Sequence, residues 1–310
     1  MLEGERILVT GATGQVARPI AEALQRAGNE VWAGARFTDP TAKADLEAQG
    51  IRTAVFNLGD PDLDHLPDVD YVIHCAVDND PKSPDDALRV NADGAGFLMR
   101  RYKDATAFFH MSSSSVYRDK ENPAAIYTED DELGGTTPYA PHYGMSKLAS
   151  EAVVRFQSRE LGLPTIMARL NVAYGTSGHG GLPMVFHEFM KGGVPYQKIA
   201  GQHAYASPIH EDDIVVQVQG LLAHAAVGAP AVNLAGDEVV TLEEIIAHLE
   251  ELTGLSMTFT ESDHLLFHTH AADTTRRREL AGPCTVPWRD GVRSALETRH
   301  PGTTSRSGVN

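Results

Sequence analysis

One junction constrains the fold more than any other feature of the sequence. An apolar segment, Arg6–Thr10, runs directly into Gly11-Ala12-Thr13-Gly14-Gln15-Val16-Ala17. The apolar segment predicts a buried strand, and the glycines permit a tight turn into a helix. A pyrophosphate can approach the backbone of such a turn, beside the unpaired N–H groups of the helix N-terminus. A purely structural strand-to-helix turn is the alternative.

We therefore predict a dinucleotide site at this junction. Ala17 stands where the usual pattern has a third glycine, and it is small enough for the helix to pack closely on the strand. The expected cofactor contacts in this segment are Gly11, Thr13, Gly14, Gln15 and Val16.

The first half of the chain alternates short apolar runs with helical patterns, which is typical of a parallel sheet covered on both faces. Helical patterns occur at Gln15–Arg26 and in a segment that begins at Ser83. We predict an α/β protein with a Rossmann-type, doubly wound parallel sheet. The predicted strands are Arg6–Thr10, Val31–Arg36, Arg52–Asn57, Tyr71–Cys75, Ala107–Met111 and Thr165–Leu170.

A further helix is predicted around Lys147. Its apolar residues recur at spacings of three and four, and this pattern predicts one buried stripe. The stripe consists of Met145, Leu148, Ala149, Ala152, Val153 and Phe156.

The pattern loosens after about Asn171, which predicts a second, smaller lobe. We expect a dinucleotide-binding domain over residues 1–175, with 207–235 returning to it. Residues 176–206 and 236–300 are expected to form a substrate lobe at the C-terminal end. Residues 301–310 are rich in Gly, Ser and Thr and are expected to be a disordered tail. No clean linker separates the lobes, so one interlocked domain is the alternative.

The end of the second predicted strand bears on the choice of cofactor. An acid at this position binds the ribose hydroxyls of NAD, whereas an arginine accommodates the 2′-phosphate of NADP. The strand ends with Gly34-Ala35-Arg36, so Arg36 is the candidate phosphate ligand and NADP the predicted cofactor, with NAD as the alternative. Asn57 and Leu58 at the end of the third strand, and Cys75 and Ala76 at the end of the fourth, are expected to border the adenine and the adjacent ribose.

Two further segments carry candidate catalytic side chains. Tyr143 and Lys147 are four residues apart, so on a helix they project from the same face. An ammonium beside a phenol favours the phenolate and lowers the tyrosine pKa, which suits a general acid or base. Ser112 to Ser115 follow an apolar strand, at the sheet edge where ligands bind. One of these serines could hold a substrate oxygen.

These motifs together resemble the extended short-chain dehydrogenase/reductase family, in its epimerase/dehydratase-like branch. The resemblance covers about residues 5–298 and includes Val72-Ile73-His74-Cys75-Ala76, Arg169–Gly175, Pro208–Asp213 and Asn233–Gly236. It implies a Rossmann sheet with a small substrate lobe.

The resemblance also assigns roles to particular residues. It implies that Ser113 is the catalytic serine, Tyr143 the proton donor and Lys147 the ribose-binding lysine. Leu170, Asn171 and Val172 should border the nicotinamide. Family members commonly form homodimers through two long helices, here about residues 84–103 and 143–160.

One departure from the family bears on the substrate. Nucleotide-sugar members usually carry an arginine just before the Ile-His pair, where this chain has Ala206. We therefore expect an NADPH-dependent oxidoreductase that interconverts a carbonyl and an alcohol on a small organic substrate. A nucleotide-sugar epimerase or dehydratase is the alternative, and a non-catalytic dinucleotide-sensing protein is a third hypothesis.

Composition excludes several other classes of function. A net charge of −16 argues against a broad basic face for nucleic acid or an anionic membrane. Every apolar run is too short to cross a bilayer, and no signal peptide is expected before the strand at Arg6. Cys75 and Cys284 cannot build a disulfide framework, so a cytoplasmic protein is expected.

No metal site is predicted from the histidines. His264, His268 and His270 lack an acid at ligand spacing and are expected to form a polar rim. The acids of His210–Asp213 suit the first turn of a helix.

Overall fold

A computed structural model describes residues 2–134, 140, 142–263, 267 and 270–304. Its centre is a parallel sheet of seven strands in the order β12-β7-β5-β4-β1-β2-β3. All six predicted strands are confirmed to within two residues at their ends, and β12 adds a seventh from the returning segment. The strands are β1 (Arg6–Thr10), β2 (Glu30–Ala35), β3 (Arg52–Val55), β4 (Tyr71–His74), β5 (Ala107–Ser113), β7 (Thr165–Leu170) and β12 (Ala231–Leu234).

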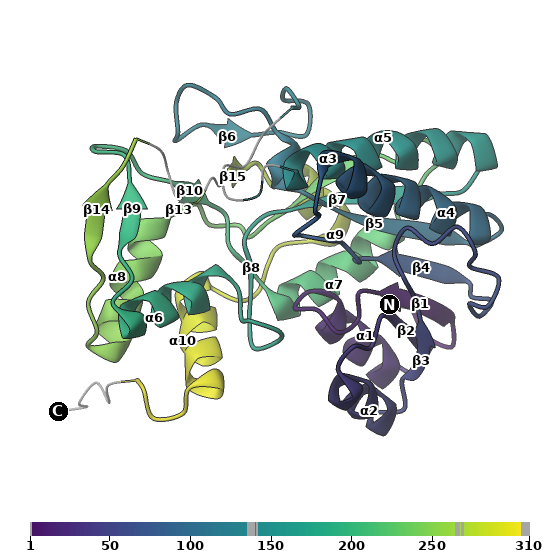
Figure 1. Cartoon of the computed structure of the whole chain (residues 1–310), viewed down its shortest axis with the longest axis horizontal. Helices are drawn as coiled ribbons and strands as arrows, with labels where there is room; N and C mark the ends of the chain where they lie inside the picture. Colours follow the sequence, from purple (N-terminus) through teal and green to yellow (C-terminus); the bar gives the residue numbers. More distant parts are fainter. Residues whose placement is uncertain (1, 135–139, 141, 264–266, 268–269, 305–310) are drawn as a thin grey trace.

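Helices cover both faces of the sheet because alternate strand residues point to opposite sides. In β1, Ile7 and Val9 pack with α1 (Ala17–Arg26), α2 (Pro40–Ala48) and α7 (Glu211–Leu222). On the other face, Leu8 packs with α4 (Gly94–Arg101) and α5 (Tyr143–Leu161). The predicted doubly wound α/β fold is therefore confirmed (Figure 1).

Three helical segments follow one another without a break before β5, and the middle one is a π-helix. Ser83 caps α3 (Pro84–Ala87), accepting the Asp86 N–H, as the sequence predicts. The chain then continues through a π-helical turn, η1 (Leu88–Asp93), into α4.

The apolar stripe of α5 does not face the core, so that prediction is wrong. The buried residues of this helix include Ser146, Lys147, Ser150 and Glu151, whereas Phe156 is 61% exposed. The inward face is polar because it meets polar side chains of β5. Ser150 bonds His110, and Glu151 accepts from Ser112. The apolar residues do share one face of the helix, but that face points away from the sheet.

A second hydrophobic core forms a smaller lobe beside the sheet (Figure 1). Its helices are α6 (Leu182–Gly192), α8 (Leu242–Thr253) and α10 (Trp288–Arg299). Short strand pairs complete this lobe and its junction with the sheet: β8 (Ala173–Tyr174) with β11 (Ile209–His210), β9 (Tyr196–Lys198) with β14 (Phe259–Glu261), β10 (Tyr205–Ala206) with β13 (Val240–Thr241), and β6 (Ile126–Tyr127) with β15 (Ala271–Ala272).

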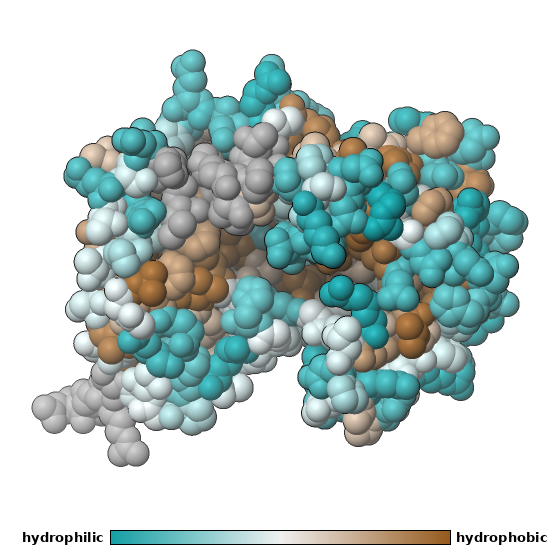
Figure 2. Space-filling model, in the orientation of Figure 1, coloured by the Kyte–Doolittle hydropathy of each residue, from teal (hydrophilic) through white to brown (hydrophobic). Residues whose placement is uncertain are grey.

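The two lobes interlock along the chain. Residues 207–235 contribute strand β12 to the large sheet and helix α7 to the layer that covers it. Helix α9 (Thr275–Ala281), from the predicted substrate segment, also packs against α7 and β12. Figure 2 shows a hollow between the lobes in which hydrophobic side chains are exposed. Among the described helices, none is both long and apolar enough to cross a membrane.

Candidate active site

A cavity of ≈ 760 Å³ opens at the carboxyl ends of the sheet strands. Most of the predicted site residues form its wall. From the predictions, the wall contains Gly11, Thr13, Gly14, Gln15, Val16, Arg36, Asn57, Leu58, Cys75, Ala76, Tyr143, Lys147 and Leu170. The sequence did not identify other members of the wall, which include Met111, Asp78, Lys82 and Arg89, whereas Ser112 belongs to the predicted serine run.

The turn after β1 has the geometry of a dinucleotide cradle. Gly11 has a φ of +74°, and a Cβ there would lie 2.9 Å from the Cα of Ala76. Only glycine fits this position without strain. The Gly14 N–H donates to the Gly11 carbonyl at 2.8 Å and closes the turn. Helix α1 begins at Ala17, two residues later than predicted. Its N-cap, Val16, forms no side-chain cap with any described residue, which suits an anion site.

Cationic side chains gather near the ends of β2 and β3. Arg36 is exposed on the cavity wall, and none of the described residues pairs with it in an ion pair or side-chain hydrogen bond. Arg89 lies on the same wall and pairs with Asp86 at 2.6 Å. A Cβ on Gly59 would lie 3.3 Å from Arg89 Nη1, which places Arg89 close to the segment that follows β3. Local sequence could not place Arg89 because its position depends on how η1 packs.

Tyr143 and Lys147 both lie in the first turns of α5 and face the same cavity. Lys147 Nζ lies 6.0 Å from the centre of the Tyr143 ring and donates to the Met111 carbonyl at 2.8 Å. Burial lowers the pKa of Lys147 to about 8, although Cys75 and Glu151 act in the opposite direction. The ammonium is therefore still the main form at neutral pH, beside a phenol that lines the cavity.

The serines at the end of β5 are not equivalent. Ser112 lines the cavity wall, but its Oγ donates to Glu151 Oε1 at 2.7 Å. Ser113 Oγ accepts the Ser115 N–H at 3.1 Å, which leaves its own O–H able to donate. Ser113 is nevertheless absent from the wall that the described residues form. Its catalytic role stays a prediction.

The segment after β7 divides between the two lobes. Leu170 lines the cavity, as expected. The Asn171 side chain instead donates to the His270 carbonyl and accepts the Ser207 N–H, so it ties β7 to the smaller lobe. Val172 packs against the second hydrophobic core. Within the described wall, Asn171 and Val172 are therefore not neighbours of the cavity.

A glycine-rich loop at residues 175–181 reaches the dinucleotide turn. Gln15 Nε2 donates to the Ala173 carbonyl at 2.9 Å, just before this loop. A Cβ on Gly178 would lie 2.8 Å from Gln15 Cβ, so loop and turn are in close contact. His179 lines the cavity, and burial lowers its pKa.

The acids that follow β11 have structural partners, in agreement with the expected helix start. His210 Nδ1 accepts the Asp212 N–H, Glu211 accepts N–H groups of Thr176 and Ser177, and Asp213 accepts those of Thr285 and Val286. His264 and His268 lie outside the described residues, whereas His270 Nε2 is 3.0 Å from Asp119 Oδ1.

Comparison with known proteins identifies the family. The model of the NAD dependent epimerase/dehydratase family matches residues 7–198. The dTDP-glucose 4,6-dehydratase of Neisseria gonorrhoeae is 32% identical over an alignment of 123 residues, covering 34% of this chain and 34% of that protein. Methionine adenosyltransferase 2 subunit beta of Bos taurus is 28% identical over 181 residues, covering 56% of this chain and 48% of that protein. The matched region thus spans less than half of either curated relative.

Solved structures share the fold over nearly the whole chain. A UDP-glucuronic acid 4-epimerase from Bacillus cereus, in complex with UDP-glucuronic acid and NAD, has a TM-score of 0.78 at 20% identity and covers 94% of this chain and 98% of its own. MoeE5 in complex with UDP-glucose and NAD has a TM-score of 0.77 at 22% identity, with coverage of 94% and 97%. The family match, the Rossmann sheet and the Tyr143–Lys147 pair agree, and the chain belongs to the NAD-dependent epimerase/dehydratase branch of the extended short-chain dehydrogenase/reductase family.

Proposed function

We propose that this protein is an NAD(P)-dependent enzyme that oxidises a carbinol carbon of a nucleotide sugar and then reduces it again, with epimerisation or dehydration as the net reaction. The observation that carries this proposal is the position of Tyr143 and Lys147 on the wall that also holds the Gly11 turn. The names of the curated relatives and solved neighbours favour this net reaction over simple carbonyl reduction.

Tyr143, Lys147 and Ser113 each have a different proposed role in moving the substrate proton. The nicotinamide, when bound, accepts or returns the hydride. Tyr143 takes the hydroxyl proton of the substrate during oxidation and gives it back during reduction. The Lys147 ammonium stabilises the phenolate of Tyr143 and can hold the cofactor ribose. Ser113 donates a hydrogen bond to the substrate oxygen as its charge changes.

The cofactor is proposed to be NADP rather than NAD. Arg36 stands at the end of β2 on the cavity wall, with no carboxylate partner among the described residues. An unpaired guanidinium suits a phosphate because it can donate two parallel, charge-assisted hydrogen bonds. The titles of the neighbouring structures name NAD, so the proposed preference departs from them.

Net reduction of an uncharged carbonyl substrate is the second candidate, and a specific observation favours it. A nucleotide sugar carries a diphosphate, which proteins usually bind with arginine or lysine. The sequence contains no lysine or arginine between Lys198 and Arg276, a stretch that includes much of the smaller lobe. Ala206, at the position where nucleotide-sugar enzymes usually have arginine, is fully buried.

Substrate panels separate the two candidates. Purified protein would be assayed with UDP- and dTDP-sugars, following product sugars by chromatography, and with a carbonyl panel, following NADPH absorbance. Sugar conversion without net change in NADPH supports the leading proposal, and NADPH consumption by carbonyls alone supports the second. In either case Tyr143→Phe should lose turnover but keep cofactor binding. Turnover that survives this substitution would exclude the proposed mechanism.

The cofactor preference is tested by titrating NADPH and NADH and following nicotinamide fluorescence. Arg36→Ala should weaken NADPH binding roughly 10- to 100-fold, because it removes a charge-assisted hydrogen bond to phosphate, and should leave NADH binding nearly unchanged. Arg26→Ala is the matched control, since Arg26 is exposed in the last turn of α1, at the far end from the cofactor turn. Equal affinity for both cofactors in the parent would overturn the assignment to NADP.

A further inference from the structure

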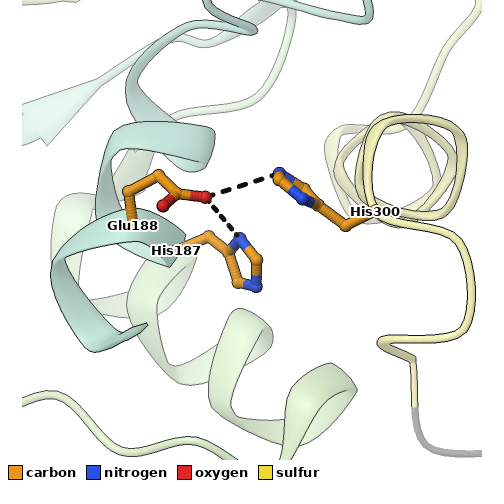
Figure 3. Close-up of side chains that lie close together, drawn as sticks. All are labelled: His187, Glu188 and His300. Atoms are coloured by element: carbon orange, nitrogen blue, oxygen red, sulfur yellow. Dashed lines mark ion pairs between the residues drawn. The ribbon is translucent and has the colours of Figure 1, made fainter. Parts of the chain in front are cut away.

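Three side chains of the smaller lobe converge at a place outside the described wall of the cofactor cavity. His187 and Glu188 lie on α6, and His300 follows the last residue of α10 (Figure 3). One nitrogen from each imidazole and one carboxylate oxygen lie within 4.8 Å of one another. We propose that this cluster binds a divalent transition metal of the Zn²⁺ class and so fastens the end of α10 to α6.

The distances are close to those of a metal site. Glu188 Oε1 lies 3.6 Å from His187 Nδ1 and 3.7 Å from His300 Nε2. Tetrahedral Zn²⁺ with bonds of about 2.0–2.2 Å holds neighbouring ligand atoms about 3.4 Å apart. Side-chain rotations therefore suffice to bring the three atoms to coordination distance. Three protein ligands would leave a fourth position for water.

The burial of His187 is the second observation that points to a ligand. Its side chain is 1% exposed, and neither ring nitrogen has a hydrogen-bond partner among the described residues. A buried polar atom without a partner costs free energy. Figure 3 shows the His187 ring turned toward Glu188, with Nδ1 nearest the carboxylate. Coordination at Nδ1 would provide this nitrogen with a partner.

The Glu188 carboxylate has a second partner, which leaves room for a metal. Lys191 Nζ lies 3.0 and 3.2 Å from the two carboxylate oxygens. A carboxylate has about four lone-pair sites, so Glu188 can bind both Lys191 and a metal.

The backbone already holds the third ligand near the site. The His300 N–H donates to the Leu296 carbonyl at 2.8 Å, which continues the helical hydrogen bonding past Arg299. Arg299 Nη1 donates to the carbonyls of Thr176 and Gly178 at 2.6 and 2.9 Å. This end of α10 is therefore ordered before a metal binds, which reduces the entropy cost of coordination. Two imidazoles and one carboxylate form a donor set that suits Zn²⁺.

The test is a titration of tag-free, chelator-treated full-length protein with Co²⁺, which reports its coordination geometry through visible absorption. We expect one equivalent of Co²⁺ to produce the intense bands of a four-coordinate ion, and Zn²⁺ to remove them. Zn²⁺ at 100 times its Kd should raise Tm by on the order of 5 °C. Absence of the bands at saturating Co²⁺ would overturn the proposal.

Variants locate the site. His300→Gln and Glu188→Gln change partly exposed residues and should each weaken Co²⁺ binding at least about 100-fold, since each removes a direct ligand. His187→Gln should do the same, but its buried position makes the first two variants the decisive ones. His203→Gln is the matched control, because His203 is 48% exposed in the same lobe and lies 3.3 Å from Glu243. Unchanged Co²⁺ binding in His300→Gln and Glu188→Gln would place any metal elsewhere and refute the proposal.

Discussion

At the scale of single residues, the site contains one position that only glycine fits and one residue whose burial lowers the free energy of unfolding. Gly11 is the first, because of its positive φ and its contact with Ala76. Lys147 is the second. The residue is only 4% exposed, and burial lowers its pKa from 10.5 to about 8. The charge that the proposed chemistry requires is therefore maintained at a cost in folding free energy.

Replacing Lys147 with an apolar residue should raise the stability of the fold and abolish turnover. Between about pH 8 and 10.5 the unfolded chain binds the Lys147 proton more tightly than the folded one, so this group makes stability rise with pH there. Below pH 8 the full cost, roughly 3 kcal/mol, is present. Lys147→Met removes it and loses a hydrogen bond worth about 1 kcal/mol. We expect Tm at pH 7 to rise by about 3 °C while turnover disappears.

The pH dependence provides the check on this explanation. The advantage of Lys147→Met in thermal unfolding should shrink as the pH rises through 8 toward 10, because the parent lysine is then neutral when folded. Lys43→Met, at an exposed position on α2, should show no such pH-dependent gain. A variant less stable than the parent at pH 7 would contradict the prediction.

At the scale of elements, a buried ion pair joins α5 to β7. Arg169 donates through Nε and Nη2 to the two oxygens of Glu151, both at 2.9 Å. Arg169 also donates to the Tyr117 hydroxyl, and Ser112 donates to Glu151. This polar network explains why the inward face of α5 carries polar residues instead of the apolar stripe. Its members support each other because every charge in it has a partner.

Removing one partner of this pair should be much worse than removing both. Arg169→Met leaves the Glu151 carboxylate buried without its main partner and should cost about 3–5 kcal/mol in the free energy of unfolding. The double variant Arg169→Met with Glu151→Met should recover most of that loss, as measured by urea denaturation. Arg118→Ala, which breaks an exposed pair with Glu132, should change stability far less. A double variant that shows the sum of two large losses would refute this account.

At the scale of the whole molecule, two features reach beyond single elements. One is the link between α10 and the cofactor turn, which runs through the loop at residues 175–181. Arg299 holds the carbonyls of Thr176 and Gly178, and Gly178 packs against Gln15. The other is the outward apolar stripe of α5, in which Ala152 and Phe156 are exposed. The family resemblance implies a homodimer interface on this helix and its neighbour, and a large exposed side chain such as Phe156 suits such an interface.

The first feature predicts that α10 affects cofactor binding from a distance. Arg299→Ala removes two charge-assisted hydrogen bonds to the loop beside Gln15 and should lower NADPH affinity about 10-fold. Arg293→Ala changes an exposed arginine on the same helix and should leave the affinity unchanged. Equal affinities in parent and Arg299→Ala, measured by fluorescence titration, would show that loop and turn are not coupled through this residue.

The second feature predicts the oligomeric state. The parent should be a homodimer in light scattering coupled to size-exclusion chromatography, and Phe156→Glu should convert it to a monomer, since burying an unpaired carboxylate is costly. Val216→Glu, at a residue 54% exposed on α7, should leave the dimer intact. A monomeric parent would refute the prediction.

The sequence by itself determined what depends on neighbouring residues: the six strands, the glycine turn, and the common face of Tyr143 and Lys147. These follow from backbone sterics and from helix and strand periods, which act over a few residues. Only the tertiary structure decided that the apolar stripe of α5 faces outward, that Ser112 is bonded to Glu151, and that Asn171 ties the lobes together. It alone brought His300 to His187 and Glu188. Such contacts depend on how whole elements pack, and the periodicity of one segment cannot specify its partner.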